Sequence, residues 1–181
     1  MQIQPLKIPG TYRILLEPHH DKRGYFLRTY EAAIFRERGL STEWVNDSQA
    51  FSVRNVVRGL HFQKPPFSET KLVRAVVGKA IDVFVDLRKS SPAFGQWDMV
   101  ELSEQNHAAV YIPKGFAHGY CTPDGDAVVA YKVDSPYAPE SEGGLRWNDP
   151  DLGIPWPVTD PTVSVKDTLW PLFRGFTTPF D

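Results

Sequence analysis

The stretch that decides the fold class is Ala80-Ile81-Asp82-Val83-Phe84-Val85-Asp86-Leu87, because its side chains alternate in two interleaved sets. Neighbouring side chains of a β-strand point to opposite faces of its sheet. One face therefore carries Ile81, Val83, Val85 and Leu87, and the other carries Asp82, Phe84 and Asp86. The pattern predicts a strand. Residues 71–77 precede it across Gly78-Lys79, a turn signal of short hairpins, so we expect these two strands to pair as a hairpin.

Further short apolar runs lie on both sides of this pair. Strands are predicted over residues 11–17, 24–30, 44–52, 56–63, 99–102, 108–112 and 127–133. Residues 20–23 form a turn between the first two. The one helix candidate is 31–38, with Ile34 and Phe35 on its apolar side and Gly39 after its end. Frequent turn residues, 16 Pro and 13 Gly, separate these runs, so we expect a mainly β fold, a sandwich or jelly-roll barrel with few short helices.

The chain of 181 residues fits one domain, residues 1–181, and no repeat or linker divides it. From about residue 134 the sequence is Pro-rich with little periodicity. Four large aromatic residues there make a disordered tail a poor interpretation: Trp147, Trp156, Trp170 and Phe173. We therefore expect an ordered C-terminal wrap or lid.

Charge and composition exclude several classes of partner. The net charge of −2 gives no overall basic field for nucleic acid, so any anion must be held by a local cluster of cations. No apolar run approaches the roughly 20 residues that cross a bilayer. Residues 1–5 lack the features of a signal peptide. Cys121 is the only cysteine, which favours a reducing, cytoplasmic location.

The hexapeptide Arg58-Gly59-Leu60-His61-Phe62-Gln63 contains the main candidate for chemistry. Histidine titrates near neutral pH, so His61 can accept a proton from a carbon acid. Taken alone, a core histidine that donates to a backbone carbonyl is the more common case, and it is the neighbouring residues that favour a catalytic role. Arg58, like Arg23, is a phosphate candidate, since a guanidinium matches phosphate geometry. In a regular strand Arg58 and His61 would point to opposite faces. Either a bulge at Gly59 corrects this, or the site lies at a subunit boundary.

Two further polar residues are predicted on apolar strand faces. Tyr131 shares a face with Ala127, Val129 and Val133, where its hydroxyl must find a partner or face a ligand. It could act as a general acid, or simply pack in a barrel. Lys71 shares a face with apolar residues of its strand and would suit an oxyanion, unless it reaches solvent from the strand end.

These segments occur in a recognisable order: Arg58 to Gln63, Lys71, the stretch Pro113 to Gly119, Tyr131-Lys132 and Lys166-Asp167. From about Ile8 to Asp167 the chain resembles the dTDP-4-dehydrorhamnose 3,5-epimerase family, cofactor-free sugar-nucleotide epimerases of cupin-like fold. The resemblance implies a nucleotide-linked 4-keto-6-deoxyhexose as substrate and a homodimer. No metal, nicotinamide or flavin is implied, because the substrate's own ketone is the electron sink.

The resemblance also implies residue roles. His61, oriented by Asp167, would remove a proton, Lys71 would support the enolate oxygen, and Tyr131 would return a proton to the opposite face. Tyr137 would stack on thymine and Glu142 would contact the nucleotide. The substrate-binding set implied in this way comprises Arg23, Phe26, Asn46, Ser48, Arg58, Lys71, His118, Tyr137, Glu142 and Lys166.

Two segments depart from the family pattern. The family commonly has Glu two residues after Gly-Phe-Phe, where this chain has Arg28 after Gly24-Tyr25-Phe26-Leu27. It commonly has Gln-Asp-Asn where this chain has Asn46-Asp47-Ser48. Both belong to the nucleotide- and sugar-binding shell. The nucleotide, the sugar and the choice of C3, C5 or both therefore stay open.

Two alternatives remain at the level of sequence. Metal-dependent cupins typically present His-x-His with a later Glu and His, but this chain has His61-Phe62-Gln63, so only His118 and Glu69 could be added. A non-catalytic jelly roll that binds sugar or nucleotide would not need a base and an acid on opposite sides of its ligand.

Overall fold

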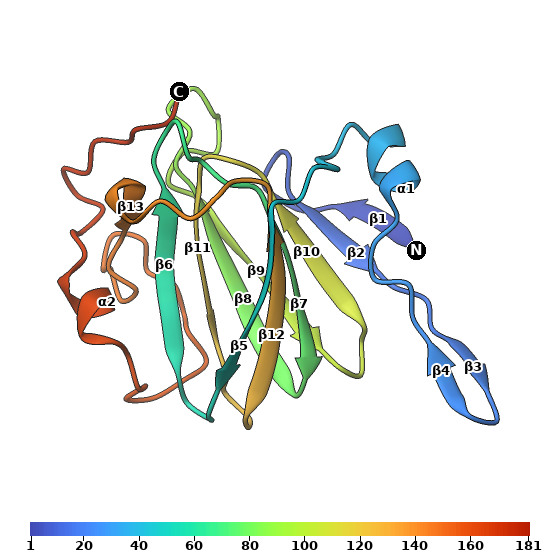
Figure 1. Cartoon of the computed structure of the whole chain (residues 1–181). Coiled ribbons are helices and arrows are strands. Elements are labelled where there is room, and N and C mark those ends of the chain that lie inside the picture. The colour runs from blue at the N-terminus through green and yellow to red at the C-terminus, as the bar shows by residue number, and fades with distance from the viewer.

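Two antiparallel β-sheets face each other in the computed structural model, which describes all 181 residues (Figure 1). In spatial order the six-stranded sheet contains β1 (Gln2–Pro5), β2 (Tyr12–Leu15), β10 (Ala108–Ile112), β7 (Lys71–Val77), β12 (Ala127–Val133) and β5 (Asn46–Ser52). The five-stranded sheet contains β13 (Glu142–Gly144), β6 (Val57–Gln63), β11 (Phe116–Cys121), β8 (Lys79–Asp86) and β9 (Trp97–Ser103). The predicted mainly β sandwich is confirmed.

The alternation in β8 has a direct structural meaning, because this strand is buried on both faces. Phe84 points between the sheets, where it packs in a core shared with Val73 of β7 and Val129 of β12. Val83 and Val85 point to the outer side of the five-stranded sheet and join a second core. The pattern of this strand therefore places it in the middle of three layers.

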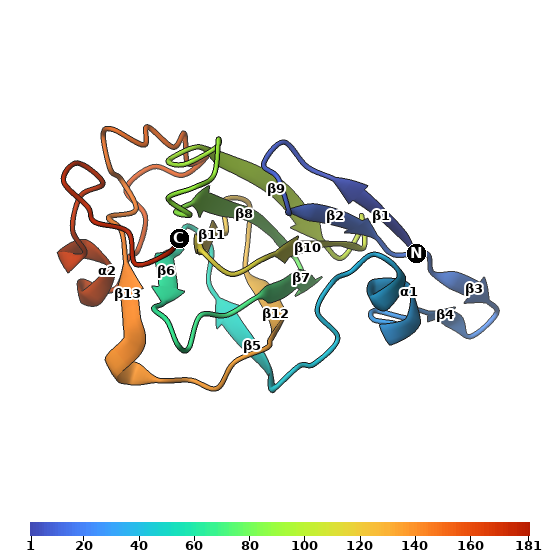
Figure 2. The same cartoon turned by 90° about the horizontal axis from the view of Figure 1, so that it is seen from above.

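The chain beyond β12 provides the third layer. Leu145, Leu152 and Phe180 are buried against the outer face of the five-stranded sheet, and Trp97 of β9 donates to the carbonyl of Leu152 at 2.7 Å. Figure 2 shows this segment, with the short helices η1 (Pro139–Ser141) and α2 (Val165–Leu169), passing along that side of the sandwich. The wrap brings α2 against β6, which positions the site described below.

Helix α1 (Ala32–Glu37) lies on the opposite side of the molecule, close to the predicted range. Phe35 is its buried residue and packs with Ile14 and Leu72 on the outer face of the six-stranded sheet. Gly39 follows the helix with a φ of +67°, as expected of a residue just past a helix end. No helix of the structure is long and apolar enough to cross a membrane.

The predicted hairpin between residues 71–77 and 80–87 is wrong. Strands β7 and β8 belong to different sheets, and the turn at Gly78 carries the chain from one sheet to the other. Both strands contribute apolar side chains to the core between the sheets, Val73 and Ala75 from β7 and Ala80 and Phe84 from β8, and the burial of these side chains favours the arrangement in which the strands face each other. Gly78 has a φ of +68°, and an added Cβ would lie 2.2 Å from the carbonyl oxygen of Asp126.

The predicted strand over residues 24–30 is much shorter in the structure. Only β4 (Gly24–Phe26) forms, paired with β3 (His19–Asp21), and this hairpin projects away from the two sheets (Figure 1). Its side chains are exposed, including Tyr25 at 56% and Phe26 at 61%. Strands β1, β3, β11 and β13 and helix α2 were not among the predicted elements, and residues 20 and 21, predicted as part of a turn, belong to β3.

Candidate active site

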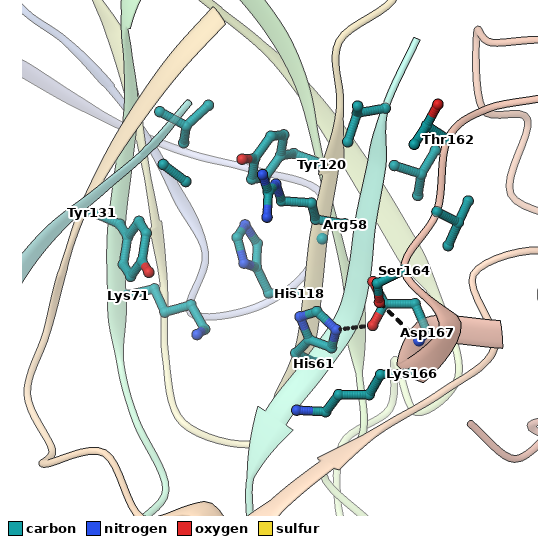
Figure 3. Close-up of a pocket in the computed structure, with 16 residues that line it drawn as sticks. Arg58, His61, Lys71, His118, Tyr120, Tyr131, Thr162, Ser164, Lys166 and Asp167 are labelled. Carbon is teal, nitrogen blue, oxygen red and sulfur yellow. Dashed lines mark hydrogen bonds and ion pairs between the residues drawn. The ribbon is translucent and has the colours of Figure 1, made fainter. Parts of the chain in front are cut away.

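A cavity of about 490 Å³ opens between the sheets beside the C-terminal wrap. Its polar lining comes from β6, β7, β11, β12 and the segment around α2 (Figure 3): Arg58, His61, Lys71, His118, Tyr120, Tyr131, Thr162, Ser164, Lys166 and Asp167. A second cavity of about 270 Å³ shares three of these residues, His61, Lys71 and Tyr131. It adds Asn46, Ser48, Glu69, Tyr137 and Glu142. Eleven of the thirteen predicted residues thus line these two adjoining cavities.

His61 and Asp167 form a dyad on one wall of the cavity. The imidazole Nε2 lies 2.5 Å from Asp167 Oδ1, although the two residues are 106 positions apart in the chain. The carboxylate can only accept, so Nε2 carries the hydrogen and Nδ1 is left to take a proton. The backbone N–H of Gly59 donates to Asp167 Oδ2 at 3.2 Å, which fixes the carboxylate further.

The environment of Asp167 favours its charged form. Burial alone would raise the pKa of this carboxyl, but the hydrogen bond and charge of His61, with donors from Gly59 and Ser164, hold the pKa below its ordinary value. Ser164 caps α2 by accepting from the Asp167 N–H at 3.1 Å. The short helix therefore presents a carboxylate anion to the histidine.

Tyr131 and Lys71 lie on the wall opposite the dyad (Figure 3). The register of β12 with β7 pairs Tyr131 with Val73 and Val133 with Lys71, so both polar side chains share the face predicted for them. Lys71 is only 12% exposed, and its Nζ lies 2.5 Å from Glu69 Oε1. The Lys71 side chain is thus held against a carboxylate beside the cavity.

A bulge in β6 brings Arg58 and His61 to the same cavity. His61 lies opposite His118 and Arg58 lies opposite Tyr120, so β6 takes three steps where β11 takes two. Gly59 supplies the extra residue, with a φ of +139°. An added Cβ at Gly59 would lie 2.6 Å from the Cα of Gly119. Of the two sequence-based explanations for Arg58, the bulge is the one that the structure contains.

His118 belongs to a second histidine–carboxylate pair. Its Nε2 lies 2.8 Å from Oδ2 of Asp82, a carboxyl with no solvent exposure. Burial raises the pKa of Asp82, and the charge of His118 only partly opposes this. No role was predicted for Asp82 from the sequence. An aspartate alternating with apolar residues of a buried strand was the available signal, since such a group needs a partner.

The smaller cavity carries the residues expected to meet the nucleotide. Lys166 forms an ion pair with Glu142, and the Tyr137 hydroxyl donates to the same carboxylate at 3.4 Å. The ring of Tyr137 is 65% exposed at the mouth of the cavity. Asn46 and Ser48 reach the cavity from β5.

Two predicted residues lie elsewhere. Arg23 and Phe26 sit on the projecting β3–β4 hairpin and line neither cavity. The Arg23 side chain is 84% exposed and pairs with Asp21 at 2.5 Å. Arg23 and Phe26 were expected to bind substrate, but within one chain they do not reach either cavity. The reason is that β4 ends at Phe26 and the hairpin projects away from the two sheets. Arg28, which departs from the family pattern, forms an ion pair with Glu31, with 3.7 Å between Arg28 Nε and Glu31 Oε2.

The metal-dependent alternative requires several ligands around one point. The structure gathers no group of three or more His, Cys, Asp or Glu side chains that could hold a metal ion. His61 and His118 each direct one nitrogen to their own aspartate, and Glu69 faces Lys71. The residues that a cupin metal site would use are thus engaged in separate pairs.

A β-sandwich cavity with a histidine base facing a tyrosine hydroxyl suits an isomerase that works by proton transfer. Comparison with known proteins agrees. The sequence profile of the dTDP-4-dehydrorhamnose 3,5-epimerase family matches residues 5–175. A dTDP-4-dehydrorhamnose 3,5-epimerase of Methanothermobacter thermautotrophicus is 45% identical over 166 residues, which is 89% of each chain.

Solved structures point the same way. The dTDP-4-dehydrorhamnose 3,5-epimerase of Elizabethkingia anophelis superposes with a TM-score of 0.93 at 38% identity, covering 97% of each chain. A Legionella pneumophila epimerase in complex with dTDP-4-keto-L-rhamnose gives a TM-score of 0.94 at 36% identity, covering 99% of this chain and 98% of that one. The chain belongs to the dTDP-4-dehydrorhamnose 3,5-epimerase family.

Proposed function

We propose that the protein epimerises a dTDP-linked 4-keto-6-deoxyhexose at C3, C5 or both, as a step of dTDP-L-rhamnose-type deoxysugar biosynthesis. One observation carries the proposal. The His61–Asp167 dyad and the Tyr131 hydroxyl lie on opposite walls of one cavity, so a sugar ring between them would meet a base on one face and an acid on the other.

The C4 ketone of such a substrate acidifies the protons on C3 and C5. His61 Nδ1 takes one of them, the C–H bond breaks, and its electron pair forms an enolate with the C4 oxygen. Asp167, whose low pKa keeps it ionised, stabilises the imidazolium that results. Lys71 has three N–H donors, so its ammonium can keep Glu69 and also donate to the enolate oxygen.

Tyr131 completes the inversion. Its hydroxyl gives a proton to the carbon from the face opposite His61, and the enolate returns to a ketone. The His61 imidazolium then releases its proton to solvent and the Tyr131 phenolate takes one up, which restores both groups. The substrate supplies its own electron sink, so we propose that the reaction uses no cofactor.

The nucleotide has a binding surface next to this centre. Arg58 and Lys166 offer positive charge to the diphosphate, and the exposed ring of Tyr137 offers a platform on which a base can stack. Glu142, Asn46 and Ser48 line the smaller cavity beside it. We assign dTDP to this surface.

The substrate site is completed, in this proposal, by a second copy of the chain. Strand β5 is an open edge of the six-stranded sheet, and large apolar side chains near it are exposed, with Phe51 at 59% and Val53 at 49%. The projecting hairpin exposes Tyr25 and Phe26 as well. Exposed apolar edges of this kind are normally covered. A homodimer would cover them and could carry Arg23 and Phe26 toward a partner's cavity.

We also propose a cytoplasmic location. Cys121 is a single, buried free cysteine, and burial raises the pKa of its thiol to about 12, so it is kept as an unreactive thiol. Fractionation of cells would test this, and recovery of the protein outside the cytoplasmic fraction would contradict it.

Turnover of dTDP-4-keto-6-deoxyglucose tests the assigned roles. We expect His61→Ala and Tyr131→Phe each to lower kcat by about 10²–10⁴-fold while far-UV circular dichroism stays unchanged. Tyr12→Phe is a matched control, because Tyr12 packs on Tyr111 away from the cavity and should turn over normally. Normal turnover by His61→Ala or Tyr131→Phe would refute the role of that residue.

A further inference from the structure

Arg58 differs from every other basic side chain that lines the larger cavity. Each of the others lies against a carboxylate: His61 with Asp167, Lys71 with Glu69, His118 with Asp82 and Lys166 with Glu142. Arg58 forms no ion pair. Its guanidinium is the one permanent positive charge in this lining that no protein carboxylate compensates.

Neutral groups hold that guanidinium in place instead. The Nε–H donates to Ser52 Oγ at 2.9 Å, and Nη2 donates to the Phe51 carbonyl at 3.0 Å. Both acceptors come from the end of β5, in the opposite sheet. The Nη1 nitrogen makes no hydrogen bond in the structure. Two contacts thus fix the plane of the guanidinium without lowering its charge.

A third residue supports Ser52 from behind. The Tyr120 hydroxyl lies 3.0 Å from Ser52 Oγ, and either group can donate. Ser52 is 2% exposed and Tyr120 is 5% exposed, so the Tyr120 hydroxyl depends on Ser52 for a partner, and Ser52 Oγ joins Tyr120 to Arg58. Tyr120 lies directly opposite Arg58 across β11 and β6. Figure 3 shows its hydroxyl beside the guanidinium.

Tyr120 cannot itself become a counter-ion at neutral pH. Burial raises the pKa of its hydroxyl, and the hydrogen bond of Ser52 and the charge of Arg58 oppose this only in part. The whole support of Arg58, two hydroxyls and a carbonyl, is therefore uncharged. An arrangement that orients a cation and leaves its charge free fits a site whose counter-ion arrives with the ligand.

We propose that Ser52 and Tyr120 are positioning residues that hold the Arg58 guanidinium ready for the diphosphate of the nucleotide sugar. This inference rests on the proposed function, which supplies the diphosphate. An unsupported arginine side chain would lose rotamer freedom on binding, whereas a held one has lost it already. The support should therefore strengthen binding of the phosphates and leave proton transfer at His61 and Tyr131 largely unaffected.

Paired binding of dTDP and thymidine separates this role from general damage. We expect Ser52→Ala to weaken dTDP binding about tenfold or more in calorimetry, because a hydrogen bond to a charged group is lost. Thymidine, which has no phosphate, should bind as it does to the wild type in an NMR titration. In turnover, KM should rise by a similar factor while kcat changes less than about threefold.

Three further variants sharpen the test. Ser52→Thr keeps the hydroxyl and should recover most of the dTDP affinity. Tyr120→Phe removes one oxygen atom and should weaken dTDP binding in the same direction, which keeps the inference testable if Ser52→Ala fails to fold. Arg58→Ala combined with Ser52→Ala should bind dTDP no more weakly than Arg58→Ala alone, since Ser52 acts through Arg58.

Unchanged dTDP affinity in both Ser52→Ala and Tyr120→Phe would overturn this inference alone. An equal loss of thymidine and dTDP affinity would overturn it too, since the effect would then not concern the phosphates. A wild-type protein that binds neither dTDP nor thymidine would overturn the proposed function together with this inference.

Discussion

At the scale of single residues, the cavity contains two histidine–aspartate pairs whose carboxyls are tuned in opposite directions. The pKa of Asp167 is lowered, chiefly because the interactions with His61 outweigh burial, whereas burial raises the pKa of Asp82. One Asp82 oxygen, Oδ1, is buried without a hydrogen-bond partner. Opposite shifts of neighbouring acids usually mark different roles. We therefore assign the base to His61, whose partner stays ionised when the imidazole gains a proton.

This difference predicts how stability depends on pH. The pKa of Asp167 is lower in the folded protein than in the unfolded chain. Its carboxylate therefore stabilises the fold fully above about pH 3.9, the ordinary pKa of aspartate. That contribution is lost as the pH falls through the pKa of the folded protein. Urea unfolding should show wild type more stable than Asp167→Asn at pH 7, with the difference shrinking below about pH 3.9. A difference that grows on acidification would contradict this.

Several site residues could be predicted from residue type and strand face, and others could not. Tyr131 and Lys71 followed from parity, because an inward polar residue needs a reason. The contact of Asp167 with His61 joins positions 106 residues apart, so only the family resemblance indicated it. Ser52 was missed because a serine at a strand end has no distinctive pattern, and its meaning depends on Tyr120 from another sheet.

At the scale of elements, the bulge in β6 is the feature on which the site geometry depends. In a regular strand, without the bulge at Gly59, Arg58 and His61 would point to opposite faces. The backbone of β11 approaches so closely at Gly119 that there is no room for a side chain. Glycine is required here both for space and for its positive φ.

Gly59→Ala tests the bulge. A Cβ would sit 2.6 Å from the Gly119 Cα at a φ of +139°, so we expect the free energy of unfolding to fall by about 2–4 kcal/mol, with loss of turnover. Gly125→Ala is the control, since an added Cβ there meets nothing within 4 Å. Its stability should stay within about 0.5 kcal/mol of wild type. Equal stability of the two variants would show that the bulge tolerates a side chain.

A strand or helix could be predicted where its own residue pattern is sufficient to define it. Strand β8 is read directly from its alternation, and α1 from its apolar side and Gly39. The error at Gly78 arose because a tight turn can join partners in one sheet or carry the chain to the opposite sheet, and only the shared core distinguishes the two. Strands β1 and β13 are too short for a pattern of their own and are defined by their partners.

At the scale of the whole molecule, the C-terminal wrap is part of the core. Its buried residues cover Val83 and Val85, and it delivers Asp167 to His61. We propose that residues 1–181 form one domain for this reason. Urea unfolding followed by tryptophan fluorescence and by circular dichroism should then give one coincident transition, whereas two separated transitions would contradict it.

The proposed homodimer predicts that a charge at the open edge of β5 separates the subunits. Phe51→Asp places a carboxylate in the proposed interface, at the position of a ring that is exposed in the single chain. Because an unpaired buried charge is costly, analytical ultracentrifugation should show a dimer for the wild type and a monomer for the variant. Phe94→Asp is the matched control, because Phe94 is also exposed but precedes β9 in the other sheet. A wild-type monomer, or a Phe51→Asp dimer as stable as wild type, would refute an interface at this edge.

The central claim is that this cavity moves protons on and off carbon atoms next to a ketone. The most direct test is incubation of the protein with dTDP-4-keto-6-deoxyglucose in heavy water, with deuterium read at C3 and C5 by mass spectrometry and NMR. The account predicts label at C3, C5 or both, dependent on His61, and the labelled positions would decide between one inversion and two. Absence of label at both carbons, with the sugar nucleotide bound, would contradict it.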